Sequence, residues 1–318
     1  MTDPDADLRR FERRLRRSRR RIRRRRIALG TVVCLLSAGV AVTVALTSPA
    51  LRNGGHQTAV AASGRRVVPL QIRSLRRRLS RGAEQVPILM YHVINSPPTN
   101  ARFPGLYVTP RQFSAQMEAL AQAGFTGVTL NQVEANWKQG APLPAGHPVV
   151  ISFDNGYRTQ FTRAFPLLRK LGWPAVENLQ LEGLPPSQGG LTPREIQALV
   201  RAGWELDTQG FTHADLIRLD PQQLLHEVGA ARVAIRRRYH TPADWFAYPS
   251  GHYDATVITA VKAAGYIGAT TVVAGWADPR DDPYTLPRFR ILAGTTPQGL
   301  LAQLADGRRT ADPPSSYL

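Results

Sequence analysis

Cysteine is almost absent from this chain of 318 residues, in which Cys34 is the only one. A disulfide within the chain is therefore excluded, and a folded domain must depend on an apolar core, which more than 200 residues can supply. The scarcity of cysteine does not exclude export, because disulfides are common outside the cytoplasm but are not required there.

Acidic residues are also scarce, with 23 Asp and Glu against 41 Lys and Arg, which gives a net charge of +18. The imbalance is local: residues 1–26 hold 13 arginines against four acidic residues, a net +9, and residues 27–85 add +7. A uniformly basic protein would suggest a nucleic-acid partner. The remainder of this chain is nearly neutral, so we expect no nucleic-acid partner.

Charged residues are missing altogether from residues 27–46, IALGTVVCLLSAGVAVTVAL. Twenty residues of helix span about 30 Å, the thickness of a bilayer core. The arginines directly before this stretch predict a cytoplasmic N-terminus. A cleaved signal peptide is the alternative, but it has a shorter apolar core and a cleavage site that Ala45-Leu46-Thr47 matches poorly. We expect a single-pass protein of the cell membrane, with 1–26 as a cytoplasmic Arg-rich tail and the C-terminal domain extracytoplasmic.

Residues 47–85 contain Pro, Gly, Ser and Arg with little periodicity, which predicts a basic flexible linker. In residues 86–318, apolar runs alternate with helical patterns, which predicts an α/β domain with a parallel sheet. Seven strands without a dinucleotide-binding glycine fingerprint favour a (β/α)7-type barrel over an open sheet, with its chemistry at the carboxyl ends of the strands. The expected strands are Val86–Met90, Thr126–Leu130, Pro148–Phe153, Ala175–Leu181, Trp204–Leu206, Trp245–Tyr248 and Tyr266–Val273.

Helix boundaries also have sequence signals. An N-cap residue followed by proline predicts a helix start, and a glycine after a helical pattern predicts an end. The starts are Thr109-Pro110, Thr192-Pro193 and Asp220-Pro221, and the ends are Gly124, Gly172, Gly203 and Gly265.

Three strands are followed by segments rich in functional side chains. These segments are Ser152-Phe153-Asp154-Asn155-Gly156, Asp207-Thr208-Gln209-Gly210-Phe211-Thr212-His213 and Phe246-Ala247-Tyr248-Pro249-Ser250-Gly251-His252. In a barrel of this type all three would open on one face.

These segments resemble the motifs of the polysaccharide deacetylases, the NodB homology domain of carbohydrate esterase family 4. The family patterns are Ser/Thr-Phe-Asp-Asp-Gly, His-Ser/Thr-x-x-His and Arg-x-Pro-Tyr/Phe-Gly, in the same order. The opening segment 87–92 and the late segment 282–288, Asp-Pro-Tyr-Thr-Leu-Pro-Arg, also resemble one branch of this family. The resemblance covers about residues 86–305 and implies a distorted (β/α) barrel.

The resemblance implies a zinc-like divalent metal with three protein ligands and an open position for water, next to a carboxylate that acts as general base. Carried over residue by residue, it implies that Asp154 is the base and His213 is one metal ligand. It implies that the oxyanion and the substrate are held by Tyr248, Pro249, Ser250 and Gly251. The reaction would release acetate from an N-acetylated sugar.

Two of the implied ligand positions are altered. Asn155 stands where the family has a metal-binding Asp, and Gln209 stands where it has the first His. Neutral amide oxygens are weak ligands for a zinc-like ion. The family's late general-acid histidine has no counterpart after His252, and Ala247 stands at the arginine of the third motif. His92 and His252 are possible additional site residues.

Two functions therefore stay open. The first is metal-dependent N-deacetylation of a cell-envelope glycan, such as peptidoglycan or an exopolysaccharide. The second is a catalytically impaired homologue, without a bound metal, that acts as a glycan-binding or scaffold module.

Overall fold

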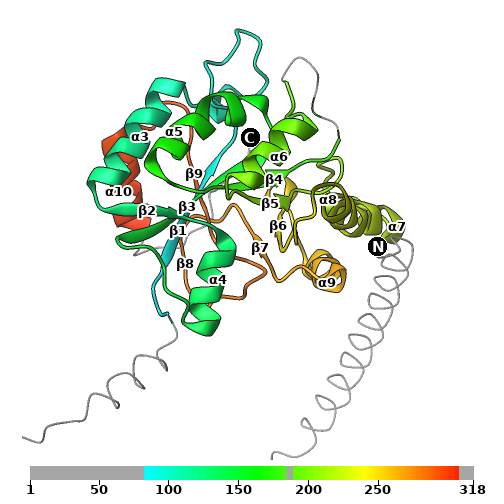
Figure 1. Ribbon diagram of the computed structural model, residues 1–318. Helices are drawn as coiled ribbons and strands as arrows, with labels where there is room; N and C mark the ends of the chain where they lie inside the picture. The colour runs from blue at the N-terminus through cyan, green and yellow to red at the C-terminus, as the bar shows by residue number, and fades with distance from the viewer. Residues whose placement is uncertain (1–81, 183, 185–188, 308–318) are drawn as a thin grey trace, which may run out of the picture. The chain divides into compact units, whose positions relative to one another are not determined.

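The apolar runs form a nine-stranded sheet in the computed structural model, which describes residues 82–182, 184 and 189–307 (Figure 1). The strand order is β7-β6-β5-β4-β3-β1-β8, with β2 beside β3 and β9 beside β1. All pairs are parallel except the antiparallel pair of β8 with β1. The strands are β1 (Val86–Tyr91), β2 (Phe125–Val128), β3 (His147–Asn155), β4 (Val176–Leu179), β5 (Glu205–Thr208), β6 (Trp245–Ala247), β7 (Gly268–Thr270), β8 (Trp276–Ala277) and β9 (Phe289–Arg290).

The predicted α/β class is confirmed, and each of the seven predicted strands overlaps or adjoins one of β1–β7. The short strands β8 and β9 were not predicted. The predicted tail, the anchor at 27–46 and most of the linker lie outside the described residues. Within the described part of the chain, no helix is both long and apolar enough to cross a membrane.

Helices occupy the connections between the strands. The predicted starts are confirmed, because Thr109, Thr192 and Asp220 each cap a helix through a reciprocal capping box with proline at the first position. The helices are α3 (Pro110–Gln122), α4 (Leu130–Gln139), α5 (Phe165–Leu171), α6 (Pro193–Arg201), α7 (Pro221–Leu224), α8 (Ala231–Tyr239), α9 (Ala255–Ala264) and α10 (Pro297–Gly307). Short turns of 3₁₀ or π-helix are η1 (Pro104–Leu106), η2 (Gln160–Ala164), η4 (Leu216–Arg218), η5 (Leu225–Ala230) and η6 (Pro249–Gly251).

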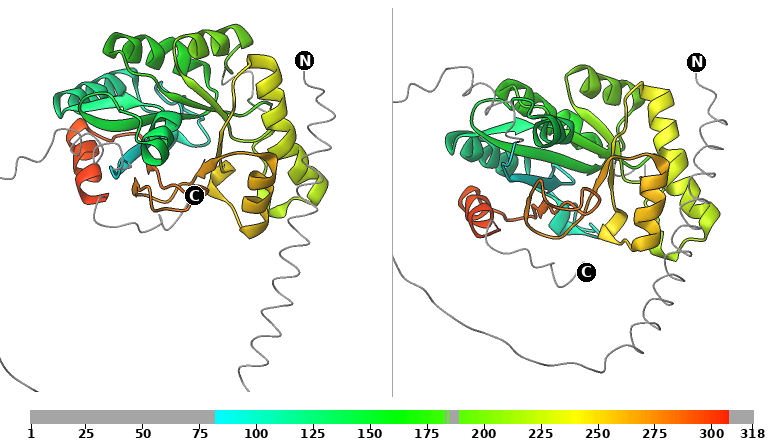
Figure 2. Two further views of the ribbon diagram at one scale, coloured as in Figure 1. Left: turned by 60° about the horizontal axis from the view of Figure 1, so that its bottom comes forward. Right: turned by 90° about the horizontal axis from the view of Figure 1, so that it is seen from below.

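Helices α3, α5, α6, α8 and α9 lie around the strands (Figures 1 and 2). The alternation of side chains along β3 explains this arrangement. Ile151 and Phe153 pack outward with Phe113 of α3. Val150 points to the other face and packs with Trp245 and with the apolar side of α4. The polar residues of β3 that share this inner face are Ser152 and Asp154, nearer its carboxyl end.

The segment 286–290 lies between β7 and β1 and brings a side chain into the interior. Leu286 forms a parallel bridge with Thr270 of β7. The N–H of Arg288 donates to the carbonyl of Val273 at 2.8 Å, and β9 then pairs with β1. Arg288 consequently lies inside the curved sheet and is fully buried.

Candidate functional site

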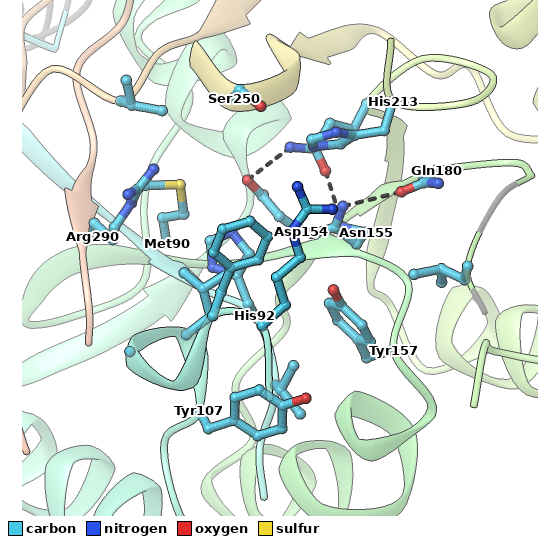
Figure 3. Close-up of a pocket in the computed structure, with 18 of the residues that line it drawn as sticks. Met90, His92, Tyr107, Asp154, Asn155, Tyr157, Gln180, His213, Ser250 and Arg290 are labelled. Atoms are coloured by element: carbon cyan, nitrogen blue, oxygen red, sulfur yellow. Dashed lines mark hydrogen bonds between the residues drawn. The ribbon is translucent and has the colours of Figure 1, made fainter. Parts of the chain in front are cut away.

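A pocket of about 780 Å³ opens at the carboxyl ends of the strands (Figure 3). His92 reaches it from the end of β1, Asp154 and Asn155 from the end of β3, and Gln209 and His213 from the loop after β5. The third predicted segment contributes as well, through its tyrosine and serine. The three segments chosen from the sequence therefore meet at one site.

Asp154 is held by a buried guanidinium. Arg288 donates from Nη1 to Oδ1 at 2.8 Å and from Nη2 to Oδ2 at 2.9 Å. The same guanidinium donates to the carbonyl of Thr271 at 2.8 Å and to Oγ of Ser152 at 3.3 Å. Burial alone would raise the pKa of Asp154, but the charge and hydrogen bonds of Arg288 outweigh burial and hold that pKa below its ordinary value. Asp154 is therefore a carboxylate at neutral pH.

Two side-chain amides complete the surroundings of this carboxylate. Nδ2 of Asn178 donates to Oδ1 of Asp154 at 2.8 Å, and Nε2 of Gln209 donates to Oδ2 at 3.3 Å. With Arg288, each oxygen of Asp154 accepts two hydrogen bonds. A carboxylate has about four acceptor sites, so a water molecule can reach Asp154 only by displacing a donor.

The amides continue as a chain across the pocket floor (Figure 3). Oε1 of Gln209 accepts the backbone N–H of Asn155 at 3.1 Å. Nδ2 of Asn155 donates to Oε1 of Gln180 at 3.1 Å, and Nε2 of Gln180 donates to the carbonyl of Glu182. The two altered ligand positions are thus bonded to the protein and to each other.

The three candidate histidines differ in position. His92 and His213 both line the pocket, whereas His252 does not, and its Nδ1 lies 3.1 Å from Oδ1 of Asp215. Burial lowers the pKa of His92 to about 4 although Asp154 opposes the shift, and its Nδ1 has no hydrogen-bond partner among the described residues. Burial also lowers the pKa of His213, again against Asp154. Both pocket imidazoles are therefore neutral at pH 7.

The third segment forms the turn η6 above the pocket. Tyr248 and Ser250 line the pocket, but Pro249 and Gly251 do not. The N–H of Tyr248 donates to a carbonyl of β7 at 3.3 Å, and the N–H of Gly251 donates to the carbonyl of Tyr248 at 2.9 Å.

Backbone strain is concentrated at the pocket. Five non-glycine residues of the described chain have positive φ, and three of them line the pocket: Asn155 at 77°, His213 at 63° and Ser250 at 53°. Such conformations cost about 1–3 kcal/mol each and persist where the surrounding structure holds them. The clustering indicates that this site is maintained for a purpose other than stability.

Comparison with known proteins identifies one family. The family described as polysaccharide deacetylase matches residues 144–269, the stretch that contains Asp154, Asn155, Gln209 and His213. A Bacillus subtilis (strain 168) protein named as a polysaccharide deacetylase, YxkH, is 27% identical over 210 residues, which are 66% of this chain and 72% of that protein. The poly-beta-1,6-N-acetyl-D-glucosamine N-deacetylase of Escherichia coli (strain K12) is 32% identical over 88 residues, 28% of this chain and 13% of that protein.

Solved structures that resemble this chain are also deacetylases. The Streptococcus pyogenes deacetylase PplD in complex with acetate has a TM-score of 0.64 and 25% identity, covering 70% of this chain and 99% of that one. A polysaccharide deacetylase from Bacillus cereus has a TM-score of 0.61 and 26% identity, covering 70% and 69%. Residues 144–269 thus form a domain that matches the polysaccharide deacetylase family, and the similar proteins are polysaccharide deacetylases. The predicted NodB-like α/β architecture is confirmed.

The donor set of this deacetylase-family domain does not fit a zinc-like ion. At the implied ligand positions, His213 is the one imidazole, while Asn155 and Gln209 are neutral amides already engaged in hydrogen bonds. The carboxylate of Asp154 is saturated by its four donors. Among the described residues, no three His, Cys, Asp or Glu side chains are grouped so that they could hold a metal.

Three residues of the polysaccharide deacetylase site were missed at the level of sequence. Arg288 belongs to the late segment that carries the family resemblance, but nothing in that segment indicates its partner. Asn178 and Gln180 alternate on β4 and just after it, and this polar alternation at a strand end was the available signal.

Proposed function

We propose that this protein is anchored in the cell membrane and binds an N-acetylated cell-envelope glycan in this pocket, without hydrolysing it by the family's metal-dependent route. The observation that carries the proposal is the double engagement of Gln209. Its amide nitrogen donates a hydrogen bond to Asp154, and its amide oxygen accepts one from the N–H of Asn155. Neither a strong metal ligand nor an accessible base remains at these positions.

Glycan binding is supported by the size and lining of the pocket. Its volume lies within the range of about 300–1,000 Å³ typical of ligand sites. Tyr107 and Tyr157 offer aromatic surface, and the amide chain offers hydrogen-bonding groups for hydroxyl and acetamido substituents. The strained backbone at three lining residues supports a retained binding role. The name of the Escherichia coli relative, a poly-N-acetylglucosamine N-deacetylase, supports an N-acetylated ligand.

Membrane anchoring is proposed from the sequence. The uncharged residues 27–46 directly after 13 arginines favour a cytoplasmic N-terminus and a domain outside the cytoplasm. That location matches a glycan of the cell envelope.

The family reaction, N-deacetylation, is the second candidate. It is favoured by the charged Asp154 and the neutral His92 in one pocket, because hydrolysis needs a group that takes the proton of water and delivers it to the departing amine, and both side chains can accept a proton. It would require Gln209 to release Asp154.

The experiment compares the full-length protein in detergent with the double variant Asn155→Asp plus Gln209→His, which restores the family residues. Binding of chito-oligosaccharide, zinc content and acetate release are measured for both. We expect the wild type to bind the sugar but to release no acetate with added zinc, and the double variant to gain zinc and release acetate. The control is a double variant with the same chemical changes at two exposed positions, Asn100→Asp plus Gln122→His.

Two results would decide against the proposal. If wild type releases acetate as fast as the double variant, the second candidate is correct. If wild type neither binds the sugar nor releases acetate, the pocket is not a site for N-acetylated glycan.

A further inference from the structure

The edge of the sheet opposite the pocket is rich in exposed cations. Helices α5, α6 and α8 each end with basic residues in the last turn. All of these basic side chains are exposed: Arg169, Lys170, Arg201, Arg236, Arg237 and Arg238. We call these six residues the basic face.

The topology places the six cations at one end of the domain. Short connections lead from the ends of α5, α6 and α8 to the amino ends of β4, β5 and β6: 172–175, 202–204 and 240–244. The three strands are parallel neighbours, so their amino ends lie at one edge of the sheet. The helices also pack together, because Leu168 of α5 shares an apolar cluster with Leu199 of α6, and Ile196 of α6 shares another with Ile235 of α8. The basic face is therefore one surface, at the opposite end of the strands from the pocket.

The charge of the basic face is not balanced within the part of the chain that the structure describes. None of its six cations forms an ion pair with an acidic residue there. Acidic residues at the same edge have other partners: Asp244 with Arg232, Asp278 with Arg280, Asp281 with the N–H of Asp278, and Asp282 with Lys262. A partner with a dense negative charge would complement the basic face.

The chain enters the domain at this same edge. The N–H of Gly82 donates to the carbonyl of Asn136 at 3.2 Å, and Nε1 of Trp137 donates to the carbonyl of Glu84 at 2.8 Å. The residues before β1 thus lie beside the end of α4, which leads to the amino end of β3. Residues 47–81 separate this point from the uncharged stretch that ends at residue 46. A flexible linker of that length, which the composition predicts, spans about 30–35 Å and would keep the domain near a membrane.

We infer that the basic face docks on anionic phospholipid headgroups of the membrane that holds residues 27–46, so that the pocket faces away from the bilayer. This inference rests on the proposed membrane anchoring. Each cation near an anionic bilayer surface strengthens binding by about fivefold. A tether raises the effective concentration of the surface and makes a small number of such contacts sufficient. The opening of the pocket at the other end of the strands is then accessible to a glycan outside the membrane.

Helix dipoles give a different reason for cations at these positions, because a positive side chain near the carboxyl end of a helix is stabilising. Lys138 of α4 and Lys262 of α9 are placed in the same way. This explanation predicts an effect on folding stability and no dependence on the charge of a lipid. The two explanations are therefore separated by measuring where the domain lies on a membrane.

The test uses the full-length protein in lipid nanodiscs made of phosphatidylcholine alone or of an equal mixture with phosphatidylglycerol. Single-molecule energy transfer to an acceptor on the lipid headgroups is measured in both. Cys34→Ser removes the native cysteine, and a donor dye is attached either at Ala202→Cys or at Asn100→Cys. Position 202 is exposed beside the basic face, and position 100 is exposed just before Arg102, which lines the pocket.

We expect a state of high energy transfer from position 202 in the anionic nanodiscs, which is lost in phosphatidylcholine alone and at high salt. Position 100 should give low transfer in both. Combining Arg236→Gln, Arg237→Gln and Arg238→Gln should lower the ratio of docked to undocked protein by about 100-fold. The matched control removes three exposed arginines near the amino ends of α3, α5 and α6, and should leave the ratio unchanged: Arg111→Gln, Arg163→Gln and Arg194→Gln.

The outcomes separate this inference from the proposed function. Equal docking in the two nanodiscs, or high transfer from position 100, overturns the inference and leaves glycan binding intact. If the control variant loses docking as strongly as the α8 variant, net charge and not the basic face is responsible, and the inference is wrong. Binding of soluble polyphosphate to the basic face, with equal transfer in both nanodiscs, would assign the face to a polyanion of the cell envelope instead. A protein that inserts into neither nanodisc disproves the anchoring, and the inference with it.

Discussion

Replacing Arg288 by methionine isolates the ion pair that holds Asp154. Methionine approximates the aliphatic part of arginine, so the change removes mainly the charge and its hydrogen bonds. The guanidinium makes two bonds to Asp154 and one each to Ser152 and Thr271, all in the interior. The variant leaves a buried carboxylate with two amide donors and no opposite charge.

The expected loss follows from the burial of both partners, of which Arg288 is 0% and Asp154 1% exposed. Removing one partner of a buried ion pair costs about 3–5 kcal/mol. For a domain of about 150–250 residues, each kcal/mol lowers the midpoint of thermal unfolding by about 2–4 °C. We therefore expect the midpoint at pH 7 to fall by about 6–20 °C.

The sign of the pH dependence gives a second readout. In the wild type the pKa of Asp154 is depressed on folding, so its stabilising effect is present above pH 4 and is lost as the pH falls through the folded-state pKa. In Arg288→Met, burial without the cation raises that pKa, so the variant should lose stability as the pH rises. The difference between the two proteins should be largest at pH 7–9 and should shrink toward pH 4.

The assay is thermal unfolding of the full-length protein in detergent, followed by circular dichroism. The control is Asp154→Leu combined with Arg288→Met, which replaces the pair by apolar side chains and should be more stable than the single variant. A midpoint for Arg288→Met within about 2 °C of wild type would refute the reasoning. So would a double variant as unstable as the single one, because the loss would then come from packing and not from an uncompensated charge.

Two further predictions concern the interior of the sheet and the chain's topology. Burial and the neighbouring Glu205 raise the pKa of Asp207, so the folded state retains a proton that the unfolded chain releases above about pH 4, and stability should fall as the pH rises. Asp207→Asn keeps the Oδ1 that accepts the N–H of Trp245 and should flatten this fall in stability between pH 6 and 9. Asp306→Asn, at an exposed site, should not flatten it. Equal slopes for wild type and both variants would contradict the argument that Asp207 retains a proton in the folded state. A reporter that is active only outside the cytoplasm should work when fused after Leu318, and activity of a cytoplasmic reporter there instead would show that residues 27–46 do not orient the chain as proposed.

Local sequence signals predict the main elements of the fold. The run from Val149 to Ile151 marks β3 because a buried parallel strand needs apolar side chains on both faces. Caps such as Thr192 are readable because the capping bond is made within four residues. Strands β8 and β9 were not predicted because a segment of two residues is too short to show an alternation of apolar and polar side chains. Both strands are defined by their pairing with β1.

The site was less predictable because its decisive contacts are distant in the chain. Asp154 lies 134 residues before Arg288, and their pairing depends on the path of the segment 286–290 between β7 and β1. The sequence indicated that Asn155 and Gln209 depart from the family pattern. It did not indicate that Gln209 directs its amide nitrogen at Asp154 and its oxygen at Asn155, which depends on side-chain orientation.

The charges at the base of the pocket explain why these two departures occur together. In the family pattern, two adjacent Asp residues at positions 154 and 155 would place two negative charges beside one arginine, and a metal cation would offset the negative charge that the arginine leaves. With Asn155, the single charge of Asp154 is matched by Arg288, and the buried group is neutral without a metal. Gln209 then supplies what a metal-binding histidine would not, a donor for Oδ2 of Asp154 and an acceptor for the N–H of Asn155 from one side chain. Each replacement makes the other favourable. Under the proposed function, the pair is one adaptation of the pocket to work without a metal and not two independent losses.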